Sequence, residues 1–218
     1  EQAGRDPSEV TLVAATKVQT SETIRAAIAA GITVCGENRA QEFTQHWQDG
    51  AYEGAKVHFI GHLQKNKLKY LVGKVDLIES VDSEELIRLI DKRAQNLGIV
   101  QDILIEVNIG GEASKSGVKP EEVEALVALA ASLPGVEPRG LMAIPPVAQE
   151  PGANRAVFAA MRQLFIDIKG KTYNNKVNID CLSMGMSGDF EDAIAEGATQ
   201  VRVGTALFGA RPANRVNG

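Results

Sequence analysis

The chain has 218 residues, of which 44% are hydrophobic and 23% charged, and its formal net charge at pH 7 is -5. This composition suits one globular domain spanning residues 1–218, and the interspersed charges give no reason to expect nucleic acid or a membrane as a partner. No apolar run reaches the ~20 residues that a membrane span needs, and no cleavable leader opens the chain. Two cysteines and three histidines lack the spacing of a disulfide framework or a metal site, so we expect no metal and a reducing, cytoplasmic location.

The first ten residues, "EQAGRDPSEV", are typical of the tail of a helix that leads into a strand. Gly4, Asp6 and Pro7 are the residues that suggest a helix end. We therefore expect that an N-terminal helix precedes the first strand and has been lost from the sequence as given.

Eight short runs are β-rich or continuously apolar, which is typical of parallel strands covered by helices on their outer face. They are residues 11–16, 33–37, 56–61, 76–80, 102–108, 139–144, 179–185 and 201–209.

Amphipathic segments alternate with these runs. In residues 81–98, Asp82 and Glu85 have the spacing of a capping box, an apolar stripe follows, and Gly98 can end the helix in a left-handed turn. The same design recurs before Gly31, in residues 123–130 and 157–168, and before Gly197, while the segment 66–73 is short and basic.

Alternating strands and helices predict a parallel sheet, and eight strands at this length favour a closed (β/α)8 barrel over an open doubly wound sheet. No "GxGxxG" follows the first strand, which also argues against a dinucleotide-binding fold.

In a barrel of this kind, ligands bind at the carboxyl ends of the strands. Lys17 stands where the first strand ends, although an isolated lysine is more often a solvated surface charge. Other residues expected at this mouth could equally be loop caps or turn formers; they are Glu37, Asn38, Gly61, His62, Ser80, Asn108, Pro145, Pro146 and the turn 183–189.

The segment "SMGMSGDFEDAIAEG", residues 183–197, predicts a strand end, a glycine turn and a helix opened by Ser187. A serine hydroxyl beside the exposed backbone N–H groups of a helix start can bind phosphate, although a plain helix cap is the simpler interpretation. Gly204 and Thr205, at the end of the neighbouring strand, favour the phosphate site.

Arg202 lies two residues before Gly204, so its side chain points to the same side of the strand and can reach a ligand's ring. A lysine that faces a phosphate cradle suggests a phosphorylated aldehyde, and pyridoxal 5'-phosphate fits this description. An arginine beside the pyridine nitrogen would disfavour protonation of that nitrogen.

Five separated motifs carry a resemblance to the pyridoxal phosphate homeostasis protein family, the single-domain relatives of the alanine racemase N-terminal barrel. They are "LVAATKVQTSETIRAAIAAGITVCGENRAQEF", "VHFIGHLQKNKLKYL", "VNIGGEASKSGV", "GLMAI" and "LSMGMSGDFEDAIAEGATQVRVGTALFGAR", and the resemblance runs from Thr11 to Arg211. It implies that Lys17 forms a Schiff base with the cofactor and that Asn38 lies beside it. It also implies that Ser187, Gly204 and Thr205 bind phosphate and that Arg202 faces the pyridine nitrogen.

The resemblance implies a protein that holds, buffers or delivers the cofactor, without efficient catalysis of its own. A minimal amino-acid racemase is the alternative. We expect no second domain that would supply a base for the opposite face, and Tyr52, Tyr70 and Tyr173 fall in or beside helical connections. A third interpretation is a barrel that binds another phosphorylated metabolite without a covalent bond.

Expected partners are the cofactor itself, amino acids held as external aldimines, and client enzymes that depend on the cofactor. We expect a monomer. The basic residues Lys65, Lys67, Lys69 and Lys115 could serve partner or ligand exchange, although a solvated surface is the simpler interpretation.

Overall fold

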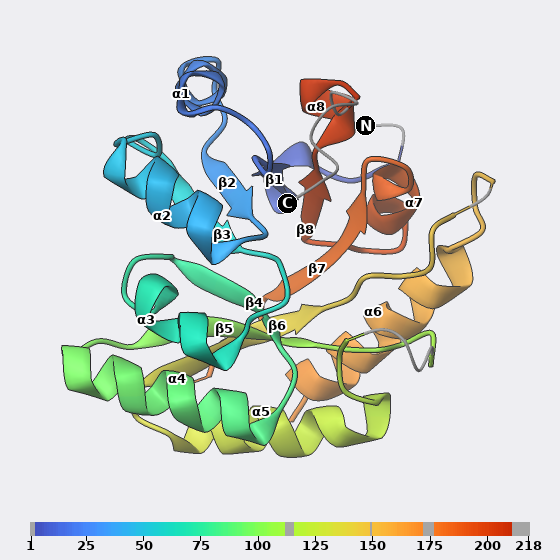
Figure 1. Ribbon diagram of the computed structural model, residues 1–218. Helices are drawn as coiled ribbons and strands as arrows, with labels where there is room; N and C mark the ends of the chain where they lie inside the picture. The colour runs from blue at the N-terminus through green and yellow to red at the C-terminus, as the bar shows by residue number, and fades with distance from the viewer. Residues whose placement is uncertain (1–2, 112–115, 149, 172–176, 211–218) are drawn as a thin grey trace.

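The computed structural model describes residues 3–111, 116–148, 150–171 and 177–210. Eight parallel strands close into a barrel in chain order, with β8 paired to β1 (Figure 1). This confirms the predicted barrel and excludes the open sheet. The strands are β1 (Thr11–Ala15), β2 (Val34–Glu37), β3 (Lys56–Phe59), β4 (Leu77–Val81), β5 (Gln101–Glu106), β6 (Val136–Met142), β7 (Cys181–Met186) and β8 (Gln200–Val203).

Helices follow the strands and lie outside the barrel (Figure 1). They are α1 (Ser21–Ala29), α2 (Ala40–Gln48), α3 (Leu68–Leu71), α4 (Glu84–Leu97), α5 (Val123–Ser132), α6 (Arg155–Lys169), α7 (Phe190–Ala195) and α8 (Thr205–Phe208), with 3-10 turns η1 (Pro7–Glu9), η2 (Lys65–Lys67) and η3 (Pro120–Glu122). Within the described ranges, no helix is long and apolar enough to span a membrane.

Two helix starts differ from the predictions. The residue that caps α4 is Ser83, whose Oγ accepts a hydrogen bond from the Leu86 backbone N at 3.3 Å, rather than Asp82. The residue before α7 is Asp189, not Ser187, and Asp189 Oδ1 instead accepts a hydrogen bond from the Met186 backbone N at 2.7 Å. Ser187 therefore lies in the turn ahead of the helix.

Two further elements were not predicted correctly. The eighth strand ends at Val203, and residues 205–208 form the short helix α8 instead of continuing the strand. Helix α2 showed no apolar stripe in the sequence, because the third residue on its buried face, after Ala40 and Phe43, is the polar His46.

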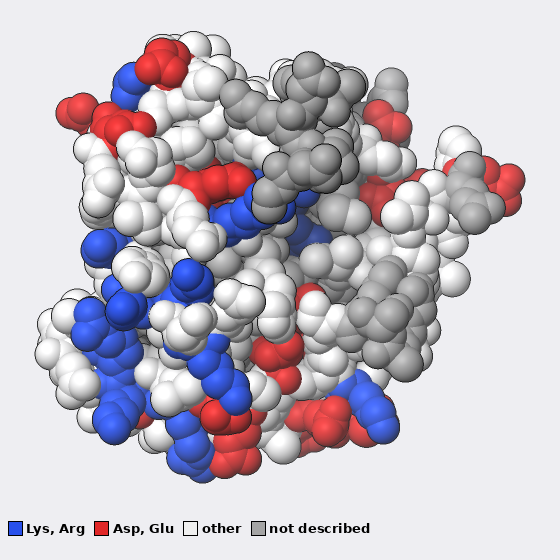
Figure 2. All heavy atoms as spheres, in the orientation of Figure 1, with Lys and Arg blue, Asp and Glu red and all other residues white. Residues whose placement is uncertain are grey.

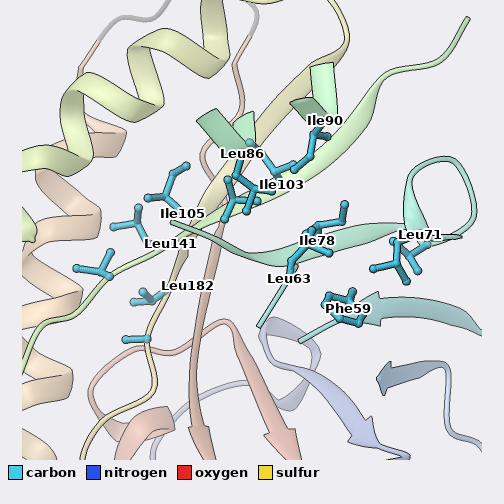
Figure 3. Close-up of a cluster of buried hydrophobic side chains, with 14 of the residues drawn as sticks. Phe59, Leu63, Leu71, Ile78, Leu86, Ile90, Ile103, Ile105, Leu141 and Leu182 are labelled. Carbon is cyan, nitrogen blue, oxygen red and sulfur yellow. The ribbon is translucent and has the colours of Figure 1, made fainter. Parts of the chain in front are cut away.

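The main apolar core lies between the strands and the surrounding helices. Figure 3 shows side chains from β3, β4, β5, β6 and β7 packed with those of α4 and of the connection that contains α3. Ile78, Ile90 and Ile103 are fully buried there. This outer layer fixes the strands, and thereby the positions at which they end.

The barrel interior is only partly apolar. Val13, Ala15, Val34 and Ile60 form one small buried cluster, and Leu77, Leu104 and Met142 form another. Polar residues take other inward positions on β3, β4, β7 and β8. They are His58, Glu79, Ser183, Gln200 and Arg202.

Candidate functional site

Four neighbouring strands, in the order β7, β8, β1, β2, bring the predicted site residues to one mouth of the barrel. Met186 pairs with Arg202, Ala14 with Val203, and Ala15 with Gly36. The segments that leave these strands carry Ser187, Gly204 with Thr205, Lys17 and Asn38, respectively. The structure thus places these five residues around the carboxyl ends of adjacent strands.

Ser187 and the start of α8 form a small hydrogen-bonding cradle. The Ser187 Oγ accepts hydrogen bonds from the backbone N of Gly204 at 3.0 Å and of Ala206 at 3.3 Å. A hydroxyl has two acceptor positions and one donor, so its own proton remains to be donated to a ligand. At Gly204 a side chain would be crowded, because a Cβ there would lie 3.3 Å from the Ala15 Cβ. The next residue, Thr205, is exposed.

Lys17 occupies a half-buried position in the turn after β1. The next residue, Val18, has a φ of 61° and is the only non-glycine residue with a positive φ among those described. A β-branched residue in this region stores about 1–3 kcal/mol of strain, which occurs preferentially at functional sites. The Val18 backbone N donates to Glu42 Oε2 at 3.1 Å, a contact that helps to hold the turn.

Glu37 does not contribute to the mouth. Its side chain is fully buried, and its Oε1 accepts hydrogen bonds from Thr16 Oγ at 2.6 Å and from the Tyr52 hydroxyl at 2.8 Å. His46 Nδ1 lies 3.2 Å from the same oxygen, and this hydrogen bond raises the pKa of His46. The network joins β2 to the residue that precedes Lys17, which is a supporting role.

Asn38 carries an unsatisfied polar atom. Its Oδ1 is buried and has no hydrogen-bond partner within the described part of the chain. Leaving a buried acceptor unpaired costs about 1–3 kcal/mol, so a ligand that donates a hydrogen bond here would remove the penalty. Gly61 packs directly against the Asn38 backbone, and the Ser80 hydroxyl, inside β4 rather than after it, donates to the Gly61 carbonyl at 2.5 Å.

Arg202 points into the barrel beneath the mouth and is only 4% exposed. Its Nη1 donates to Ser183 Oγ at 2.6 Å and its Nη2 to the Ala143 carbonyl at 2.8 Å. A guanidinium has five N–H donors, so further donors remain. Glu106, at the carboxyl end of β5, is a titratable neighbour that the sequence did not single out, and burial raises its pKa to about 7.

Of the other predicted mouth residues, Pro145 is buried and Asn108 is half-buried, with its backbone N donating to the Val118 carbonyl at 2.8 Å. His62 is exposed, and the side chain of Asn154 donates to the Pro146 carbonyl at 2.9 Å, so that Pro146 helps to order the loop after β6. Lys65, Lys67 and Lys69 belong to a basic surface; Figure 2 shows Lys and Arg gathered where Figure 1 places α3 and α4. Lys115 and Tyr173 lie outside the described residues.

The fold and the mouth geometry define a closed β/α barrel with a lysine and a hydrogen-bonding cradle at one mouth, together with an amide oxygen that has no partner among the described residues. The chain belongs to the family of the alanine racemase N-terminal domain, whose model matches residues 9–212.

Two similar relatives are both named pyridoxal phosphate homeostasis protein. The protein from Aquifex aeolicus is 47% identical over 211 residues, which cover 97% of this chain and 91% of the relative. The protein from Escherichia coli strain K12 is 41% identical over 212 residues, which cover 95% of this chain and 88% of the relative.

Solved structures agree with this assignment. PipY from Synechococcus elongatus, solved with PLP bound, has a TM-score of 0.84 and 34% identity, and the match covers 95% of this chain and 96% of PipY. Alanine racemase from Clostridium difficile has a TM-score of 0.78 at 15% identity, with coverage of 98% of this chain and 58% of the racemase. This second match supports the fold alone.

Proposed function

We propose that this protein binds pyridoxal 5'-phosphate at the carboxyl mouth of the barrel and takes part in the homeostasis of that cofactor. The observation that carries the proposal is the convergence of Lys17, Asn38 and the Ser187–Gly204 cradle on the ends of adjacent strands. The names of the relatives and the cofactor bound to PipY support it independently.

The residues present fit the cofactor. Pyridoxal phosphate supplies an aldehyde that condenses reversibly with a primary amine. In the proposed site Lys17 supplies the amine, the Ser187 hydroxyl and Thr205 donate to the phosphate, and Gly204 leaves room for it. Asn38 contributes an acceptor that has no partner among the described residues. Arg202 is assigned to the pyridine nitrogen from below.

The role proposed is to hold and deliver the cofactor in the cytoplasm, as a monomer, with amino acids and client enzymes as partners in exchange. Tyr52 is no replacement for an opposite-face base, because its hydroxyl donates to the Glu37 carboxylate and burial raises its pKa, which keeps the hydroxyl protonated. Cys35 and Cys181 are free thiols, which is compatible with a reducing compartment.

The phosphate assignment predicts a selective loss of affinity. Ser187→Ala and Thr205→Ala each remove a donor to a charged acceptor, so the affinity for pyridoxal phosphate should fall roughly tenfold or more for each change. Pyridoxal, which lacks the phosphate, should bind about as well to the variants as to the wild type. Spectroscopic titration with both ligands measures this difference, and equal losses for both would place the two residues away from the phosphate.

The carrier role predicts transfer without efficient turnover. Loaded protein is incubated with L- and D-amino acids in deuterated water, while a parallel assay follows reactivation of a cofactor-dependent apo-enzyme. We expect reactivation, with negligible incorporation of deuterium at the α-carbon and no change in the ratio of enantiomers. Turnover at or above ~1 per second would instead identify a minimal racemase.

A further inference from the structure

A chain of hydrogen bonds crosses the barrel interior beneath the proposed cofactor site. Glu79, on β4, is fully buried. Its Oε1 accepts from Gln200 Nε2 at 2.6 Å and lies 2.9 Å from His58 Nδ1, and its Oε2 accepts from Ser183 Oγ at 2.6 Å. Ser183 Oγ in turn accepts from Arg202 Nη1. One carboxylate therefore joins inward side chains of β3, β7 and β8.

This chain of hydrogen bonds runs from one mouth of the barrel toward the other. His58 lines a cavity of about 690 Å³ whose other lining residues, such as Lys56, Asp76 and Asp102, stand at the amino ends of their strands. Arg202, at the other end of the chain, lies just below Gly204 at the carboxyl mouth. Only the Arg202 end is close to the proposed cofactor site.

Buried charges are unfavourable in a barrel interior, which bulky apolar side chains usually fill. Burying an ion pair costs several kcal/mol per ion, and well-packed apolar residues in its place are often neutral or stabilising. A contribution to stability therefore does not explain why Glu79 and Arg202 are buried together. A need for a positive charge at a fixed place would explain it.

Glu79 is suited to hold that charge. Burial by itself would raise its pKa, but the His58 hydrogen bond and charge, together with Arg202 and Ser183, outweigh burial and leave the pKa below its ordinary value. Glu79 Oε2 lies 3.9 Å from Arg202 Nη1 with Ser183 Oγ bonded to both, so the serine couples the two charges. Burial lowers the pKa of Arg202, and Glu79, Glu106 and Asp189 oppose this effect.

We propose that Glu79 is a positioning residue for the cofactor site, which acts through Ser183 to hold the charged guanidinium of Arg202 in a fixed orientation against the ring of bound pyridoxal phosphate. This inference rests on the proposed function. Glu79 itself touches only protein side chains, and its influence on the cofactor passes through the arginine.

The first test uses the protein without cofactor. Glu79→Gln removes the carboxylate that faces Arg202, and Arg202→Met removes one of the two cations near Glu79, so each should lower the midpoint of urea unfolding. The double variant Glu79→Gln/Arg202→Met leaves neither charge and should recover most of the loss. A double variant whose loss equals the sum of the two single losses would show that the residues are not coupled, and would overturn the proposal.

The second test reads the cofactor. In the wild-type background, Glu79→Gln should weaken pyridoxal phosphate binding by about tenfold and shift the visible absorption band of the bound cofactor. In the Arg202→Met background, the same change should alter neither quantity. Equal effects in both backgrounds, or none in the wild-type background, would overturn the inference, whereas failure of the wild type to bind the cofactor would overturn the proposed function.

Two further variants complete the design. Ser183→Ala keeps both charges and removes only the bridging hydroxyl. It should shift the absorption band in the direction expected for Glu79→Gln, and it provides the test if Glu79→Gln does not fold. Asp91→Asn alters another buried carboxylate, on α4, whose partners are the Gly135 backbone and Gln95. It should lower stability without moving the band; a shift of equal size would show that Glu79→Gln reports general destabilisation.

Discussion

Replacement of Lys17 by alanine should abolish covalent attachment of pyridoxal phosphate and leave the fold intact. Lys17 is half-buried in a turn after β1 and lies outside the buried apolar clusters, so its loss removes little core packing. The variant should keep the wild-type far-ultraviolet circular dichroism spectrum. It should lack the visible absorption band of the bound cofactor, and borohydride reduction should trap no labelled peptide.

Lys56→Ala is the matched control for this experiment. Lys56 is another lysine on the barrel, but it is exposed, stands at the amino end of β3 and lines the cavity at the opposite mouth. Its replacement should leave the absorption band and the trapped peptide unchanged. If the Lys17 variant still yields a labelled peptide, the lysine found in that peptide is the anchor and the assignment of Lys17 is wrong.

The strand order could be predicted from the sequence because most of the strand segments are largely apolar on both faces and because they alternate with helices. That pattern is produced by burial on both sides, which few other arrangements require. The end of β8 could not be predicted, since Val203 and the apolar residues 206–208 read as one run. The backbone turns at Gly204, which a strand would also have tolerated.

The mouth residues were predictable for the same reason as the fold. In a closed parallel barrel every strand ends at the same mouth, so residues that follow the strands must converge. Lys17, Asn38 and Gly204 illustrate this rule. Glu37 and Ser80 do not follow this rule. They lie within the last two residues of their strands and pack against neighbouring segments.

The interior network could not be predicted from one sequence. Glu79 meets Gln200 across 121 positions of the chain and Ser183 across 104, and neither contact leaves a local pattern. The polar residues that alternate along β7 and β8 were a usable signal, because inward positions recur with a period of two. They did not reveal which carboxylate would neutralise Arg202.

Replacement of Gly61 by alanine should damage both the fold and the cofactor site. A Cβ at this position would lie 2.1 Å from the Asn38 carbonyl oxygen and 2.6 Å from the Asn38 Cα, and these backbone atoms cannot move aside like the end of a side chain. Overpacking usually costs about 1–3 kcal/mol, and a clash with backbone should reach the upper end of that range.

A side chain at position 61 should displace the Asn38 backbone, which Gly61 contacts, and should thereby disturb the ligand that Asn38 is proposed to bind. We expect the Gly61→Ala protein to unfold at lower urea concentration and, where folded, to bind pyridoxal phosphate more weakly. Gly170→Ala, at the end of α6, is the control, since its nearest neighbour would be a carbonyl at an ordinary 3.4 Å. A Gly61 variant as stable and as avid as the Gly170 variant would show that the contact between the β2 and β3 loops does not position Asn38.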